Sequence, residues 1–103
     1  MEKVSCLELR PVDGRKSFYG KAKVFYHPVT DAYMLMSYDT IVAMYYRGSG
    51  LFIRKWYGYS ATTMRHVNAF VRFLGGADGG KAWWDSLPMH TGVKLSRGAG
   101  YGG

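Results

Sequence analysis

The sequence contains little cysteine, little acid and no long apolar run. Its one cysteine, Cys6, can neither form an internal disulfide bond nor supply a multi-cysteine zinc site, which indicates a reducing compartment. The longest uninterrupted apolar run, residues 41–46, is far shorter than the roughly 20 residues that a membrane-spanning helix needs. Residues 1–6 lack the apolar segment of a secretory signal peptide. We therefore expect a soluble cytoplasmic protein without a membrane partner.

The excess of basic residues is the main functional signal in the composition. The 103 residues suffice for one small domain, and 48% of them are hydrophobic, which is too many for a disordered chain. Fourteen Lys and Arg stand against seven Asp and Glu, and nine of the fourteen lie in two windows without acid, residues 14–30 and 40–77. A net charge of +7 fits a polyanionic partner, such as nucleic acid or an acidic protein surface. The alternative is that the charge serves solubility alone.

Four segments predict β-strands: residues 17–26, 32–38, 41–47 and 51–56. The connections between them are short, and Gly48-Ser49-Gly50 is a strong hairpin signal because glycine tolerates a positive φ. Short connections make consecutive strands antiparallel neighbours. The sequence therefore predicts a four-stranded antiparallel meander, with residues 3–9 as a candidate fifth strand at its edge.

Beyond Gly58 the apolar residues recur at helical spacing. Ser60 is a good N-cap residue, and Gly75-Gly76 is a typical helix end. Between them runs an apolar stripe of Met64, Val67, Phe70, Val71 and Leu74, and the opposite face carries Arg65, Asn68, Ala69 and Arg72. His66 flanks this stripe as a boundary residue.

A second, shorter helix is expected over about residues 78–87, where Trp83, Trp84 and Leu87 could pack as a cover before Pro88 ends it. Strands followed by helices predict an α+β fold, in which the meander packs against the amphipathic helix and the short helix. We assign residues 1–88 to this domain and the Gly-rich residues 89–103 to a C-terminal tail.

Three segments resemble a known family. They are Ser37-Tyr38-Asp39-Thr40-Ile41-Val42-Ala43, the distinctive Gly58-Tyr59-Ser60-Ala61-Thr62-Thr63-Met64-Arg65-His66-Val67, and Ser17-Phe18-Tyr19-Gly20-Lys21-Ala22. Over about residues 17–87 the chain resembles a family of small uncharacterised proteins from bacteria, phages and other mobile elements. The resemblance implies a phage or mobile-element origin and assigns no catalytic residue. Proteins of that origin often bind and inhibit host machinery or handle nucleic acid.

The sequence contains no recognisable catalytic, cofactor or metal motif. The seven carboxylates are scattered and mostly fall at turns, and the three histidines lack metal-ligand spacing. Residues 75–81 are glycine-rich and end in a lysine, but they lack the spacing and the following Ser or Thr of a phosphate loop. We therefore predict a protein that is not an enzyme and holds no cofactor.

Basic and aromatic residues interleave on the last predicted hairpin, where Phe52, Arg54 and Trp56 share one strand face and Leu51, Ile53 and Lys55 the other. Nucleic-acid bases stack on aromatic rings while arginine and lysine contact the phosphates. The candidate partner-binding residues are Arg47, Phe52, Arg54, Lys55 and Trp56 on the hairpin, and Arg65, Asn68 and Arg72 on the helix. A sheet that simply fills its core with aromatic residues is the competing interpretation.

Two functions remain open at this point. One is a non-enzymatic module that binds single-stranded nucleic acid, and the other is a protein-binding inhibitor of a host complex, of anti-defence or anti-CRISPR type. The first requires exposed Arg54 and Trp56 on the sheet and exposed Arg65 and Arg72 on the helix. The oligomeric state and the choice between RNA and DNA are left open by the sequence.

Overall fold

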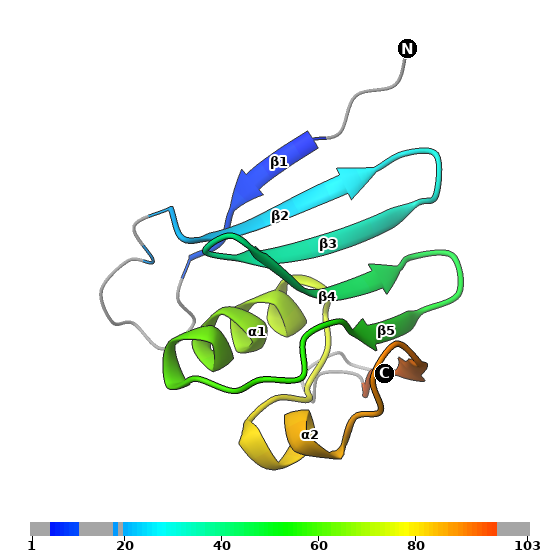
Figure 1. The fold of residues 1–103 in the computed structure, drawn as a ribbon. Helices are drawn as coiled ribbons and strands as arrows, with labels where there is room; N and C mark the ends of the chain where they lie inside the picture. The colour runs from blue at the N-terminus through cyan, green and yellow to red at the C-terminus, as the bar shows by residue number, and fades with distance from the viewer. Residues whose placement is uncertain (1–4, 11–17, 19, 97–103) are drawn as a thin grey trace.

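The chain forms one antiparallel β-sheet with two helices on one of its faces (Figure 1). The computed structural model describes residues 5–10, 18 and 20–96. The strands are β1 (Ser5–Glu8), β2 (Ala22–His27), β3 (Ala32–Ser37), β4 (Thr40–Tyr46), β5 (Leu51–Arg54) and β6 (Gly92–Lys94), and the helices are α1 (Ala61–Phe73) and α2 (Lys81–Ser86). The α+β class predicted from the sequence is confirmed.

The sheet has six strands, and they follow one another in chain order from β1 to β6. Each is antiparallel to its neighbours, so the predicted meander is confirmed, with β1 at its edge. The sixth strand was not predicted. Residues 92–94 were assigned to a tail beginning at residue 89, but they pair with β5 through Leu51↔Lys94, Phe52↔Val93 and Ile53↔Gly92. The domain therefore continues past residue 88, while residues 97–103 of the predicted tail lie outside the described residues.

Helix α1 begins and ends at the residues that carry its local signals. The side chain of the N-cap residue Ser60 accepts a hydrogen bond of 3.0 Å from the backbone N–H of Thr63. The helix ends at Phe73, and Gly75 follows with a φ of +84°, a conformation that glycine adopts without strain. Both predicted ends of this helix are confirmed.

The buried face of α1 is wider than the predicted stripe. Val67, Phe70 and Val71 are fully buried, as expected. Ala69, predicted on the opposite face, and His66, predicted at the boundary, are also buried. For His66 the reason is the chain before β2, because the ring of Phe18 packs edge-on against the imidazole, with 4.5 Å between the ring centroids.

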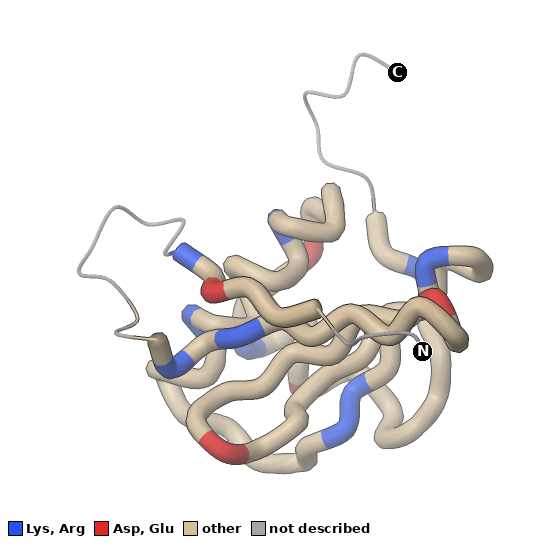
Figure 2. The backbone as a smooth tube through the Cα atoms, turned by 90° about the horizontal axis from the view of Figure 1, so that it is seen from above, with Lys and Arg blue, Asp and Glu red and all other residues tan. Residues whose placement is uncertain are grey.

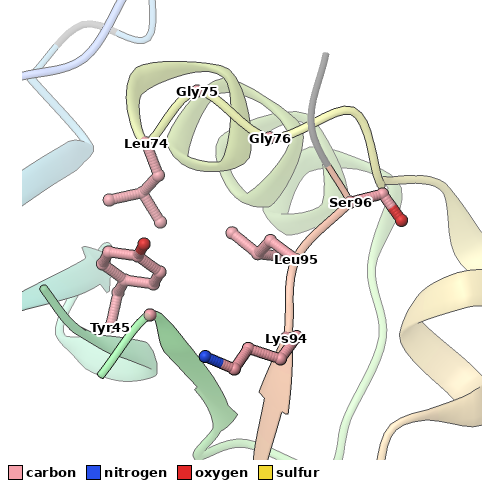
Figure 3. Close-up of a pocket in the computed structure, with 8 residues that line it drawn as sticks. Tyr45, Leu74, Gly75, Gly76, Lys94, Leu95 and Ser96 are labelled. Atoms are coloured by element: carbon pink, nitrogen blue, oxygen red, sulfur yellow. The ribbon is translucent and has the colours of Figure 1, made fainter. Parts of the chain in front are cut away.

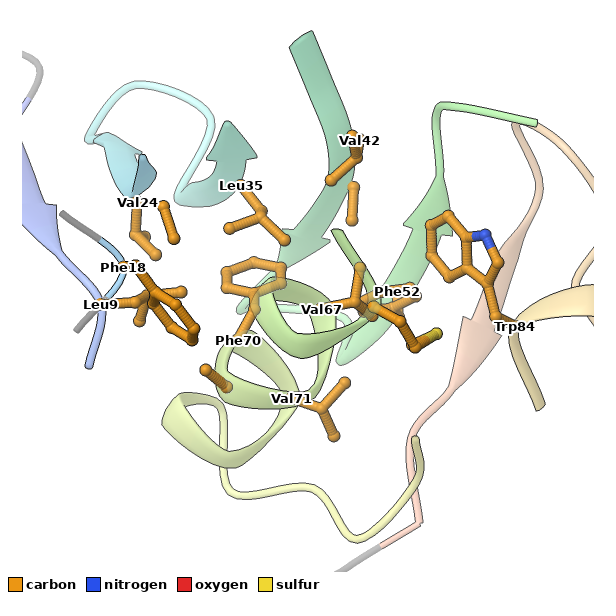
Figure 4. Packing of buried hydrophobic residues seen from close by; sticks show 14 of the residues in the cluster. Leu9, Phe18, Val24, Leu35, Val42, Phe52, Val67, Phe70, Val71 and Trp84 are labelled. Atoms are coloured by element: carbon orange, nitrogen blue, oxygen red, sulfur yellow. The ribbon is translucent and has the colours of Figure 1, made fainter. Parts of the chain in front are cut away.

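The hydrophobic core lies between the sheet and the two helices (Figure 4). Phe52 of β5 lies 6.1 Å from Phe70 of α1 and 5.2 Å from Trp83 of α2, measured between ring centroids. Because both helices contact this one side chain, they lie on the same face of the sheet. Trp84 and Leu87 are buried beside them, and this confirms the predicted cover formed by the short helix.

Candidate functional site

Arg54, at the centre of the predicted basic and aromatic site, is buried. Only 6% of it is exposed, and its guanidinium group donates to four backbone carbonyls. Nε donates to Trp56 (2.8 Å), Nη1 to Trp84 (2.6 Å), and Nη2 to Tyr57 (2.6 Å) and Gly58 (3.3 Å). The prediction of an exposed Arg54 is therefore wrong: the chain that leaves β5 turns its carbonyls inward, and the guanidinium satisfies them.

Of the two rings of the predicted stacking surface, one is buried and the other is only partly exposed. Phe52 is fully buried, and Trp56 is partly buried and packs against the core. The Trp56 ring lies so close over Gly58 that a Cβ atom on this glycine would stand 2.4 Å from the ring. Phe52, Arg54 and Trp56 do share a face, as the alternation predicted, but it is the face turned toward the helices.

On α1, Asn68 and Arg72 act mainly on the loop that follows the helix. Arg72 is exposed, as predicted, and its Nη1 donates to the carbonyls of Gly76 and Asp78, both at 2.9 Å. Oδ1 of Asn68 accepts a hydrogen bond of 3.0 Å from the backbone N–H of Gly80. These two residues therefore hold the connection between α1 and α2 in place.

The remaining candidate cations lie apart from one another. Arg65 is partly buried, contrary to the prediction, with its guanidinium carbon 5.1 Å from the centre of the Phe18 ring. Arg47 pairs with Asp31 at the tips of two hairpins, and Lys55 lies at the end of β5. Figure 2 shows the described lysines and arginines on several separate parts of the chain, with acidic residues among them. The eight candidate residues do not form one patch.

The exposed ion pair of Arg47 joins the two hairpin tips. Its Nε donates to Oδ1 of Asp31 at 2.9 Å, and the hydroxyl of Tyr26 donates to the same oxygen at 2.7 Å. The Tyr26 hydrogen bond and the nearby Arg47 charge lower the pKa of Asp31, and the pKa of Tyr26 is raised in turn. Tyr26 and Arg47 both donate to Asp31, and these contacts hold the two hairpin tips together.

A buried polar cluster joins α1 to β3. Oγ of Ser37 lies 2.7 Å from Nδ1 of His66 and 3.1 Å from Oγ1 of Thr63. Burial, assisted by the positive charge of Arg65, lowers the pKa of His66 to about 4, so the imidazole is neutral at pH 7. Although a serine beside a histidine can act as a nucleophile, Ser37 is only 3% exposed and His66 only 1%, which leaves a substrate no approach. The cluster therefore links the two elements.

A pocket of about 280 Å³ opens between the end of α1 and β6, lined in part by Tyr45, Leu74 and Leu95 (Figure 3). The cation at its rim, Lys94, donates from Nζ to the carbonyl of Ser49 at 2.7 Å, so it is already engaged. Among the described residues no group of three or more His, Cys, Asp or Glu could hold a metal ion.

The face of the sheet opposite the helices, called here the open face, was not predicted as a site. Paired residues of antiparallel strands point to the same side of a sheet. The register places one row across all six strands, called here the apolar row: Cys6, Phe25, Met34, Met44, Ile53 and Gly92. Phe25, Met34, Met44 and Ile53 are half-buried, and none belongs to the core or packs against it.

Two further apolar pairs widen the apolar row. Met36 pairs with Ile41 on one side of it, and Tyr46 pairs with Leu51 on the other. Leu51 leans over Gly92, where a Cβ atom would come within 3.0 Å of its side chain. Both described helices lie on the other face, so no described helix covers this surface (Figure 1). The open face is therefore a continuous surface of methionine, isoleucine, leucine and aromatic side chains.

A model of a protein family of unknown function, DUF8033, matches residues 7–86. The chain belongs to DUF8033. The match begins ten residues before the resemblance noted over residues 17–87, and it includes the second half of β1, all of β2 to β5, and both helices. No curated protein and no solved structure matches the chain.

In this DUF8033 chain a sequence signal for the open face does exist. An amphipathic strand alternates apolar and polar residues. In β3, however, Met34, Leu35 and Met36 are consecutive apolar residues, so both faces of the strand are apolar. The same holds for residues 41–46 of β4. Such strands are typical of a sheet that is covered on both faces, and the described helices cover one.

Neither described helix of the DUF8033 chain combines the length and the apolar character that crossing a membrane requires.

Proposed function

We propose that this DUF8033 chain is a non-enzymatic binding module that docks a partner protein on the open face of its sheet. The observation that carries the proposal is the apolar row, which runs across all six strands on the face that no described helix covers. Contiguous exposed apolar surfaces mark interaction sites in proteins. Methionine side chains, three of which lie here, adapt their shape to a partner.

The chemistry of the open face favours protein over single-stranded nucleic acid. Binding single strands by stacking requires aromatic rings beside free cations. On the open face the carbocyclic rings are Phe25 and Tyr46, and the neighbouring positions hold methionine, isoleucine and leucine. The rings and the guanidinium expected to do this work, Phe52, Trp56 and Arg54, are engaged on the core face.

The biological role that fits such a module is inhibition or recruitment of a host complex. The resemblance to proteins of phages and other mobile elements supports this role, as does the small size of the domain. We therefore propose that the chain is an accessory protein that binds host machinery, of anti-defence or anti-CRISPR type. The cytoplasm, where such machinery acts, is the corresponding location.

Site-specific photo-crosslinking tests the docking face. A photoreactive phenylalanine analogue replaces Met44 on the open face in one variant and Tyr57, which is 81% exposed on the loop after β5, in the control. In nuclease-treated host lysate we expect a discrete crosslinked protein band from position 44 and none from position 57. Equal crosslinking at both positions, or a position-44 product that disappears with nuclease, would contradict the proposal.

Binding of a polyanion is the second candidate, and the net charge of +7 is the observation that favours it. Arg54 is buried among backbone carbonyls, so this candidate requires Arg47, Arg65 and Arg72 to exchange their present contacts for phosphates and Lys55 to add a fourth phosphate contact. The logarithm of affinity for mixed single-stranded oligonucleotides should then fall against the logarithm of salt concentration with a slope of about −3. A flat salt response would reject this candidate.

A further inference from the structure

We infer that the partner of the open face is an acidic amphipathic helix. This inference rests on the proposed docking function and names the chemistry of the occupant. It follows from three features of the described residues: the shape of the apolar row, the way the other face is covered, and the charges around the row.

The length of the apolar row matches a helix. Neighbouring strands lie about 4.8 Å apart, so the row across six strands is about 24 Å long. A helix rises 1.5 Å per residue, and about 16 residues would cover this length. On the other face the sheet already packs against the 13-residue helix α1, through side chains such as Met64, Val67 and Phe70. A second helix would complete a three-layer arrangement.

The charges around the row favour an acidic occupant. Lys23 and Lys55 belong to the open face by strand alternation. The exposed Lys21, one residue before β2, continues the alternation of Lys23. Among the positions that the register assigns to this face, the acidic residue is Glu8, and it is paired with Lys23 of the neighbouring strand. A helix with Glu or Asp beside its apolar stripe would place carboxylates near these lysines.

A second copy of the chain fits this face less well. Packed sheets lie about 10 Å apart, which is close to the screening length at physiological salt. A face-to-face dimer would bring together two chains that each carry a net charge of +7, with lysines at the margins of both faces. The same charge attracts an acidic partner and repels a second copy.

Methionine-methyl NMR on the full chain tests the inference. Of the six methionines, Met34, Met36 and Met44 report the open face, and Met64, which is 6% exposed under α1, is the internal control. The probes are two 16-residue helical peptides with the same leucine stripe, one with glutamate and the other with lysine at the polar positions. We expect the glutamate peptide to shift the three open-face signals, to leave Met64 unmoved, and to bind at least 10-fold more tightly than the lysine peptide at low salt.

Other occupants give other patterns. Equal affinity for both peptides would overturn the acidic chemistry and leave the docking face standing. Shifts of the open-face signals on raising the protein concentration alone would identify a second copy instead. Shifts seen only with a mixed oligonucleotide, or only with phosphatidylserine vesicles, would likewise overturn the inference. If neither peptide moves the open-face signals, the inference fails, and the crosslinking at position 44 decides separately whether the docking function stands.

Charge-removing variants sharpen the test. We expect the double variant Lys23→Gln, Lys55→Gln to lose at least 5-fold in affinity for the glutamate peptide. The control is Lys81→Gln, which removes an exposed lysine of α2, on the other side of the sheet. The control removes one charge where the double variant removes two. A control loss of half the double variant's on a logarithmic scale, or more, would therefore mean that only the overall charge matters, and would overturn the placement of the acidic partner on the open face.

Discussion

The guanidinium carbon of Arg54 lies 4.5 Å from the centre of the Trp84 ring, while its Nη1 donates to the carbonyl oxygen of the same residue. One arginine thus joins the end of β5 to α2 through a ring contact and a hydrogen bond. The indole N–H of Trp84 also donates to the carbonyl of Gly58, at 3.0 Å, which Arg54 contacts too. The segment between β5 and α1 is therefore fastened to α2 by these two side chains.

Replacing Arg54 should destabilise the protein strongly. In Arg54→Lys the single ammonium group cannot reach both the carbonyls of the segment after β5 and the Trp84 carbonyl of α2. Some of these buried acceptors would therefore lose their hydrogen-bond donor. We expect the free energy of unfolding, measured by urea denaturation, to fall by about 3 kcal/mol because buried carbonyls lose their hydrogen bonds. Lys55→Gln, at the next position, should leave the urea midpoint unchanged. A midpoint for Arg54→Lys equal to that of the wild type would contradict the buried role of this residue.

Adjacent residues of β3 should respond very differently to a polar substitution. Leu35 is fully buried under the helices, whereas Met34 lies half-buried on the open face. We expect Leu35→Gln to cost about 3 kcal/mol or more and Met34→Gln less than about 1 kcal/mol in urea denaturation. Similar losses for the two variants would mean that both faces of the sheet are covered in the folded chain.

Two phenylalanines of α1 provide a matched pair. Phe70 is fully buried between Phe52 and Phe73, whereas Phe73 is 41% exposed at the end of the helix. Phe70→Ala should lower the free energy of unfolding by roughly 3–5 kcal/mol, a large share of the stability of a small domain. Phe73→Ala should cost clearly less, because its ring leaves a smaller void. Thermal and urea unfolding of both variants give the comparison, and the reverse order would refute the packing described for α1.

His66 should make the folded chain sensitive to acid. Burial holds its pKa at about 4, below the ordinary value of 6.5, so the unfolded chain takes up a proton that the folded chain does not. Stability contributed by the neutral imidazole is fully present above pH 6.5 and is lost as the pH falls through about 4. The loss amounts to about 3 kcal/mol, which is the pKa difference converted to free energy.

The measurement for His66 is urea denaturation between pH 7 and pH 4. The variant His66→Gln should show a shallower decline than the wild type. An unchanged decline in His66→Gln would show that the carboxylates alone govern acid unfolding, among them Asp31 with its lowered pKa.

Local signals made α1 and the meander predictable. A cap such as Ser60, a stop such as Gly75 and short turns act within a few residues, so they can be read without knowledge of the tertiary fold. Strand β6 escaped prediction because it has three residues and sits in a glycine-rich segment, and only the edge of β5 gives it a partner.

The candidate site depended on packing that no local pattern contains. Alternation correctly grouped Arg54 with Phe52 and Trp56, but the other face of β5 was equally apolar, with Leu51 and Ile53. The face of β5 that becomes buried is the one on which α1 and α2 pack, and the strand's own sequence does not contain this information. An arginine at a core position is explained only by the carbonyl oxygens that surround it, and these come from the segment after β5 and from helix α2.

The position of β6 has a consequence for shortening the chain. The family match stops at residue 86, yet the outer edge of β5 is hydrogen-bonded to residues that come later. The carbonyl of Ser96 accepts a hydrogen bond from the amide of Ala77, and its own amide donates to Asp78, which ties that stretch to the loop after α1. A truncation at the family boundary would remove the strand that pairs with β5 and leave an unpaired strand edge, which is prone to aggregation. Recombinant fragments of this protein should therefore extend at least to residue 96.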